Sequence, residues 1–308
     1  MSAIKIFNPV VYLDRRRRTW PAAGLLEDRL VMSKPARKDF TAPKTAFYTI
    51  QDYWFWAAGK KLQMRPRSFE PRRALPGSME EKLTKIDRFL IPGPVGSLEA
   101  VLEYDANTAP AYSAVVCHPH PLYGGTMHTK IVFRAAKAAV LEGLPALRFN
   151  FRGVGTSQGE FAHGIGELED VRAALDAISA RYPAVPVFLM GFSFGSAMCL
   201  QVGASDQRVA ALVGMGLPVQ KYDFSYLHSC LKPKLFVEGS EDEFGPRAQV
   251  EDLIATVSPP KELHWIEGGD HYCTGRLDEV EEVIRRFIRQ TVVDDSKRQQ
   301  GDPSRSLP

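Results

Sequence analysis

A serine lies between two glycines in the stretch Gly191-Phe192-Ser193-Phe194-Gly195, directly after an apolar run at residues 187–190 that is typical of a buried strand. A serine on a sharp turn from a strand to a helix has a strained backbone, and its neighbours two positions away must lack side chains to avoid a collision. The turn also holds the hydroxyl group above the first amides of a helix, which favour negative charge. The pattern predicts Ser193 as a nucleophile, with the amide of Phe194 as a donor to an oxyanion.

A serine hydroxyl group is a weak nucleophile unless a base takes its proton, and that base must be oriented by an acid. The chain offers Asp242 and then His271, each in a loop that follows an expected strand. Glu241 and Glu243 are rival acids, but the shorter side chain favours Asp242. Asp270, beside the histidine, is interpreted as a solvated or structural carboxylate. These residues predict a Ser193-Asp242-His271 triad.

Three of the seven histidines, His118, His120 and His128, lie within eleven positions of one another. A zinc site would need three or four ligands in a fixed geometry, and these histidines straddle a loop and a helix start with no nearby cysteine, so no metal is expected. The loop instead follows an expected strand, where a backbone amide is needed for the oxyanion. We expect an amide near His120 or Leu122 to face the oxyanion, and the side chains of His118 and His120 to hold the loop by hydrogen bonds.

From residue 82 onward, short apolar runs alternate with helical patterns, which is typical of an α/β fold with a doubly wound, mostly parallel sheet of about eight strands and helices on both faces. The first two strands are joined through Pro92-Gly93-Pro94-Val95-Gly96, a stretch too short for a crossover helix, so they are expected to be antiparallel. Strands are expected at residues 85–91, 98–104, 113–117, 146–150, 187–190, 209–215, 234–237 and 262–266, and helices at 129–142, 166–181, 194–202, 247–257 and 277–290.

The charge distribution divides the chain. Residues 1–80 hold 16 Lys and Arg against 7 Asp and Glu, whereas the remaining residues hold 23 against 29. We therefore separate a basic, Pro- and Arg-rich extension at 1–78 from a domain at 79–290 and a polar tail at 291–308 that is expected to be disordered.

The extension has no sustained hydrophobic period, and three interpretations compete for it. The favoured one is a disordered or loosely docked segment. A nucleic-acid or membrane-surface arm is less favoured, although a basic run at 15–18 and an aromatic cluster at 53–56 are present. The third hypothesis is that translation starts near Met79; an intact mass from the native host tests it.

The cysteine spacing and the length of the apolar runs indicate in which cellular compartment the protein is expected. The four cysteines, Cys117, Cys199, Cys230 and Cys273, lie far apart with no Cys-x-x-Cys pair, which argues against a disulfide framework. No apolar run approaches the roughly 20 residues that cross a bilayer, and no signal peptide is recognisable. The expectation is a soluble, cytoplasmic protein without a cofactor.

Several motifs in one order resemble the α/β-hydrolase superfamily: the stretch from His118 to Met127, the Gly-rich stretch that begins at Arg148, and the stretches around Ser193, Asp242 and His271. More narrowly, residues 82–290 are similar to small, nearly lidless bacterial hydrolases related to dienelactone hydrolases and X-Pro-dipeptidyl-peptidase-like domains. The resemblance implies the same Ser-Asp-His triad. Dienelactone hydrolases proper use cysteine as the nucleophile, so their chemistry is disfavoured.

The function expected from these residues is that of a serine hydrolase, a carboxylesterase that cleaves small or medium esters or thioesters through an acyl-enzyme. The segment at 217–234 is too short for a helical cap, so an open site with a small-molecule ester as substrate is expected. Arg152 is interpreted as a scaffold residue that pairs with a carboxylate to fix its loop beside the site. A small-peptide serine peptidase, an acyltransferase and a non-catalytic binding protein on the same fold are the alternatives, and acyl chain, leaving group and oligomeric state stay open.

Overall fold

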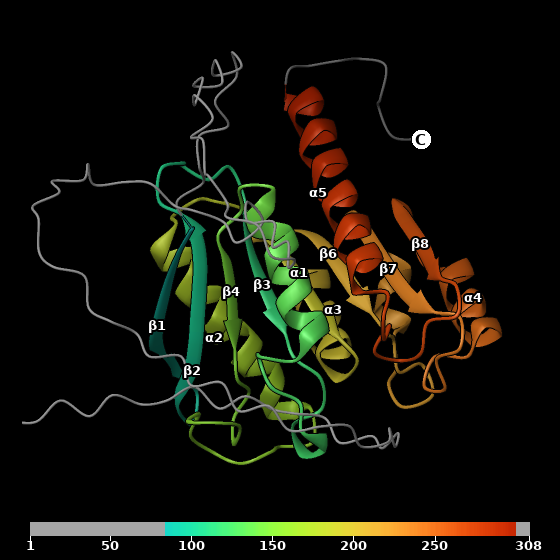
Figure 1. The fold of residues 1–308 in the computed structure, drawn as a ribbon, viewed down its shortest axis with the longest axis horizontal. Helices are drawn as coiled ribbons and strands as arrows, with labels where there is room; N and C mark the ends of the chain where they lie inside the picture. The colour runs from blue at the N-terminus through green and yellow to red at the C-terminus, as the bar shows by residue number, and fades with distance from the viewer. Residues whose placement is uncertain (1–83, 300–308) are drawn as a thin grey trace, which may run out of the picture. The chain divides into compact units, whose positions relative to one another are not determined.

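Eight strands form one sheet in the order β1-β2-β4-β3-β5-β6-β7-β8 in the computed structural model, which describes residues 84–299 (Figure 1). Strands β1 and β2 are antiparallel, as expected, and the pairs from β4 to β8 are parallel, which gives the expected mostly parallel sheet. Strand β2 is also antiparallel to β4, a pairing that the sequence did not predict. The predictions for residues 1–78 lie outside the described residues. The strands are β1 (Thr84–Gly93), β2 (Gly96–Asp105), β3 (Ser113–Cys117), β4 (Ala146–Phe149), β5 (Val187–Phe192), β6 (Val209–Met215), β7 (Lys234–Gly239) and β8 (Lys261–Ile266).

Helices cover both faces of the sheet, which confirms the predicted fold class (Figure 1). One face carries α1 (Lys130–Leu141) and α5 (Leu277–Gln299), whose apolar residues share one cluster with the strands. The other face carries α2 (Ile165–Arg181), α3 (Phe194–Ser205) and α4 (Arg247–Thr256). Burial on both faces is the reason why the central strands read as continuous apolar runs rather than alternating ones.

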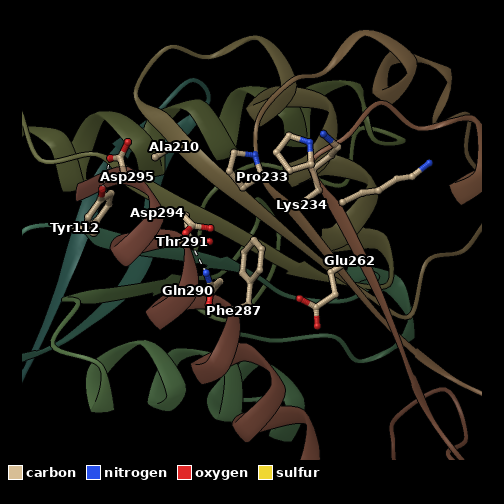
Figure 2. Close-up of a pocket in the computed structure, with 12 residues that line it drawn as sticks. Tyr112, Ala210, Pro233, Lys234, Glu262, Phe287, Gln290, Thr291, Asp294 and Asp295 are labelled. Carbon is tan, nitrogen blue, oxygen red and sulfur yellow. Dashed lines mark hydrogen bonds between the residues drawn. The ribbon is translucent and has the colours of Figure 1, made fainter. Parts of the chain in front are cut away.

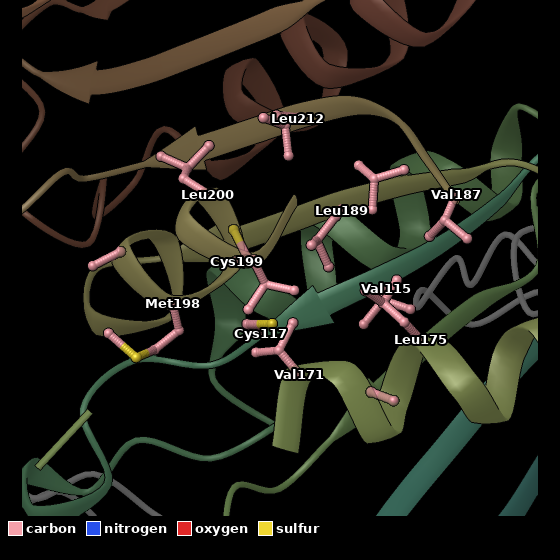
Figure 3. Close-up of a cluster of buried hydrophobic side chains, with 14 of the residues drawn as sticks. Val115, Cys117, Val171, Leu175, Val187, Leu189, Met198, Cys199, Leu200 and Leu212 are labelled. Atoms are coloured by element: carbon pink, nitrogen blue, oxygen red, sulfur yellow. The ribbon is translucent and has the colours of Figure 1, made fainter. Parts of the chain in front are cut away.

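The core beneath the α2 and α3 face fixes the strand that carries Ser193 (Figure 3). Val115 of β3 and Leu189 of β5 pack there with Leu175 of α2 and Leu200 of α3, and all four side chains are fully buried. Close packing of this kind leaves little room for the β5 to α3 turn to shift.

The prediction of an irregular tail after residue 290 was wrong for residues 291–299, because α5 continues to Gln299. Val292 packs against the cluster on the α1 and α5 face, and the Tyr112 hydroxyl group donates a hydrogen bond to Asp295. The Gln290 amide also donates to Asp294 one turn later at 3.0 Å. These contacts give the polar segment partners that its composition does not reveal.

No helix among residues 84–299 is long and apolar enough to cross a membrane.

Between β6 and β7 the chain forms only a short 3-10 helix, η3 (Ser225–Ser229), so this segment does not form a multi-element cap, as expected. A second 3-10 helix, η2 (Pro121–Tyr123), lies in the loop after β3.

Candidate active site

Ser193 occupies the turn between β5 and α3 with φ 54° and ψ −121°, a left-handed conformation that is rare for residues with a side chain. The flanking glycines are required by close backbone contacts. A Cβ atom on Gly195 would lie 2.5 Å from the carbonyl oxygens of Cys117 and His118, and one on Gly191 would lie 2.2 Å from the Gly195 oxygen. The motif therefore forms the strained strand-to-helix turn that the sequence predicted.

A chain of hydrogen bonds joins Ser193, His271 and Asp242. The distance from His271 Nε2 to Ser193 Oγ is 2.9 Å, and that from His271 Nδ1 to Asp242 Oδ2 is 2.7 Å. The Asp242 side chain is fully buried, and its other oxygen accepts the Phe244 amide at 2.8 Å. An ionised Asp242 requires the proton on Nδ1, which leaves Nε2 free to accept the serine proton.

The rival acids lie apart from this chain of bonds. Glu241 and Glu243 are exposed. Asp270 accepts the Thr274 amide at 2.8 Å, and this bond is the main reason why the pKa of Asp270 falls below its usual value. Asp270 thus stabilises the turn at residues 270–274, as expected of a structural carboxylate.

The loop after β3 is held by two histidine side chains, as predicted. His118 is fully buried, its Nδ1 atom lies 2.6 Å from the Pro119 carbonyl oxygen, and its Nε2 atom accepts the Phe151 amide at 3.0 Å. Burial lowers the pKa of His118 to about 4, so the ring is neutral near pH 7. His120 Nδ1 accepts the Leu122 amide at 3.2 Å, and burial lowers the pKa of His120 as well.

The structure separates the two residues proposed for the loop side of the oxyanion site. His120 lines the same pocket as Ser193 and Phe194, whereas Leu122 lies outside the lining and is 65% exposed. The Leu122 amide is also already bonded to His120. Within the described residues, the backbone amides of His120 and Phe194 donate no hydrogen bond.

Aromatic side chains dominate the pocket, which encloses about 620 Å³. Phe244 and Tyr272 flank the His271 ring at centroid distances of 4.7 and 5.4 Å. Their closeness to His271 and Asp242 in the sequence was a signal that the sequence analysis did not use. The lining consists of Pro119, His120, Tyr123, Ser193, Phe194, Pro218, Lys221, Tyr222, Phe244, His271 and Tyr272.

A buried carboxyl group that the sequence analysis did not single out supports one wall of this pocket. Glu238, at the end of β7, is fully buried, and both of its oxygens lie 3.0 Å from the Leu217 amide. Burial raises the pKa of Glu238. The bond fixes the chain next to Gly216, where a Cβ atom would lie 3.2 Å from His271 Cε1.

Arg152 fixes the neighbouring loop through Asp170, which confirms the predicted carboxylate pair. Nε and Nη2 of Arg152 donate to the two oxygens of fully buried Asp170 at 3.0 and 2.7 Å. Phe161 of this loop packs on His120 and Phe194 with ring centroids 4.8 and 5.9 Å apart. Arg152 therefore acts on the site through packing, as a scaffold residue.

A second cavity of about 330 Å³ lies where β3, β7 and β8 begin, beside α5 (Figure 2). No serine, cysteine or histidine is among the described residues that line it. Its polar groups already have protein partners: the Lys234 ammonium group donates to the carbonyl oxygens of Cys230 and Lys232, and Glu262 pairs with Arg286. The cavity thus lacks the chemistry found at Ser193.

Among residues 84–299, no three histidine, cysteine or acidic side chains are grouped so that they could hold a metal ion. His118 and His120 instead use ring nitrogens in hydrogen bonds to the backbone, at Pro119 and Phe151 for His118 and at Leu122 for His120.

Comparisons with known proteins agree with this geometry. Residues 115–290 match a family model described as an alpha/beta hydrolase domain. An uncharacterised protein of Rickettsia prowazekii (strain Madrid E) is 36% identical over 206 residues, which span 64% of this chain and 86% of that protein. A solved alpha-beta serine hydrolase homologue from Coxiella burnetii is 40% identical, with a TM-score of 0.62 over 65% of this chain and 96% of that one. A serine hydrolase without lid from Xanthomonas campestris is 31% identical, with a TM-score of 0.62 over 67% and 94% of the two chains.

Proposed function

The chain belongs to the α/β-hydrolase family, and we propose that it cleaves small or medium carboxylic esters or thioesters through an acyl-enzyme on Ser193. The observation that carries this proposal is the hydrogen-bonded series from Ser193 through His271 to Asp242, which opens into an aromatic pocket. Each group in the series has the partner that its role requires.

In the acylation step, His271 Nε2 takes the Ser193 proton while Oγ forms a bond to the carbonyl carbon of the ester. Asp242 stabilises the imidazolium ion and holds the ring in position. The tetrahedral intermediate then expels the alkoxide, or the thiolate of a thioester, which takes the proton from Nε2, and the acyl group stays on Ser193. In the second half, His271 deprotonates water, the hydroxide attacks the acyl carbon, and the acid leaves as Ser193 regains its proton.

The amides of Phe194 and His120 are proposed to bind the oxyanion. Both residues line the pocket with Ser193, and neither amide is used within the described part of the chain. Phe194 is also the first residue of α3, where the helix dipole favours negative charge. Leu122 is not proposed for this role because its amide is bonded to His120.

Ester cleavage is favoured over peptide cleavage by the charges of the pocket. A peptidase that binds a free N-terminus needs a carboxylate to hold the ammonium group. None of the described residues in the pocket lining carries a carboxylate. Asp242 and Glu238, which lie near His271, are buried and bonded to His271 and to the Leu217 amide.

A fluorophosphonate probe tests the nucleophile, read by the intact mass of the full chain. We expect one adduct on the unchanged protein and none on Ser193→Ala, with turnover of p-nitrophenyl esters that falls as the acyl chain outgrows the pocket. Ser225→Ala, at an exposed position of η3, is the matched control and should keep the adduct. An adduct that persists in Ser193→Ala, or an inert wild-type protein, would refute the proposal.

A further inference from the structure

Among the described residues that line the pocket, Lys221 is the only lysine or arginine, and none carries a carboxylate. Lys221 lies in the segment between β6 and β7, next to the lining residue Tyr222, and it is exposed. Its backbone amide donates to the Pro218 carbonyl oxygen at 2.9 Å, but within the described residues its ammonium group forms no ion pair and no hydrogen bond. Lys232, eleven positions later, differs, because its ammonium group donates to the Gly203 carbonyl oxygen at 2.7 Å. The Lys221 charge is therefore available to a bound molecule.

The described carboxylates close to the pocket lie outside its lining, so they do not compete with a bound anion for the Lys221 ammonium group. Glu167 is fully buried and accepts the amides of Ala162 and Gly164 at 2.7 Å each. Asp242 is buried behind His271, and Glu243, although exposed, lies outside the lining. Among the described lining residues, Lys221 is thus the one side chain outside the reacting groups that can bring a positive charge to a bound carboxylate without a competing carboxylate in the lining.

The walls of the pocket fit a flat or apolar group. Phe194 lies between His120 and Tyr222, with ring centroids 5.1 and 6.0 Å away. Phe244 and Tyr272 stand on the side of His271. Aromatic walls of this kind bury apolar surface without demanding a hydrogen bond from it.

Resting on the proposed function, we propose that Lys221 is a specificity-determining residue that selects esters carrying a carboxylate on an apolar body. The apolar body lies between the aromatic walls, and the carboxylate pairs with the Lys221 ammonium group while the ester carbonyl is held at Ser193. Because the pair is exposed to water, its effect is modest, on the order of a 2- to 5-fold change in KM, and salt weakens it.

Two matched substrate pairs test this on the full chain. The first pair is p-nitrophenyl hydrogen glutarate and its neutral methyl ester, which differ in charge on the acyl side. The second pair is 4-carboxyphenyl acetate and 4-carbamoylphenyl acetate, which differ on the leaving-group side. Lys221→Met is compared with Lys85→Met, which removes an exposed lysine on β1 at the far edge of the sheet. Within the described residues the Lys85 ammonium group has no ion pair and no hydrogen bond.

For at least one pair, Lys221→Met should raise the ratio of the anionic KM to the neutral KM by about 2- to 5-fold, with kcat for the anionic ester nearly unchanged. Lys221→Glu should raise the ratio further, added NaCl should shrink the difference, and Lys85→Met should leave the ratio unchanged. An unchanged ratio in both pairs overturns the inference, as does an equal rise for both members of each pair. An unchanged ratio overturns this inference alone when the wild type still hydrolyses neutral esters and the fluorophosphonate still labels Ser193. When the wild type does neither, the proposed function fails as well.

Discussion

Acidification from pH 7 to pH 4 is expected to destabilise the fold through His118. The ring is fully buried, and its Nε2 atom accepts the Phe151 amide, so protonation would cost both a desolvated charge and this hydrogen bond. The folded chain therefore keeps the ring neutral with a pKa of about 4, whereas the unfolded chain has the usual value near 6.5.

The sign and size of the effect follow from linkage. Between pH 6.5 and pH 4 the unfolded state binds a proton that the folded state excludes, so the free energy of unfolding falls as the pH falls and the loss is complete below about pH 4. At about 1.36 kcal/mol for each pH unit, this interval corresponds to a loss of about 3 kcal/mol from one residue. Above pH 6.5 both states are neutral at this ring, and the contribution no longer changes.

Urea unfolding of the full chain at several pH values between 4 and 7 measures the effect. His118→Gln removes the titrating group, so the wild type should lose about 3 kcal/mol more than the variant over this range, whatever the other residues contribute. Parallel curves for the wild type and His118→Gln would refute the reasoning.

Two further predictions concern buried pairs. Asp242→Asn removes the charge that stabilises protonated His271, so kcat for a p-nitrophenyl ester should fall by about 10³- to 10⁴-fold. The circular dichroism spectrum should stay unchanged. A loss of kcat below tenfold would exclude Asp242 as the acid of the triad. Arg152→Met leaves the buried Asp170 charge unpaired, so the free energy of unfolding measured in urea should fall by about 3–5 kcal/mol. Adding Asp170→Asn to this variant should restore part of the loss. If Arg152→Met is as stable as the wild type, the role given to this pair is contradicted.

Much of the fold could be predicted from the sequence because strands buried on both faces leave continuous apolar runs. Strands β3 and β6 begin and end at the predicted residues. Helix α5 was predicted nine residues too short, because its end is stabilised by Tyr112, which lies 183 positions before Asp295 in the chain. Polar composition alone does not reveal a partner so distant in sequence.

The candidate site also has a part that could be predicted from the sequence and a part that depends on the tertiary structure. By itself, the sequence determined the serine turn, because the steric demand for Gly191 and Gly195 is local to five residues, and it determined the order of acid and histidine after their strands. Only the tertiary structure decided which loop residue faces Ser193 and which side chains line the pocket. Lys221 and Tyr222 come from a segment without a periodic pattern, and their position beside Ser193 depends on the pairing of β5 with β6. Contacts across the sheet join residues far apart in the chain, and such contacts leave no regular spacing in the sequence.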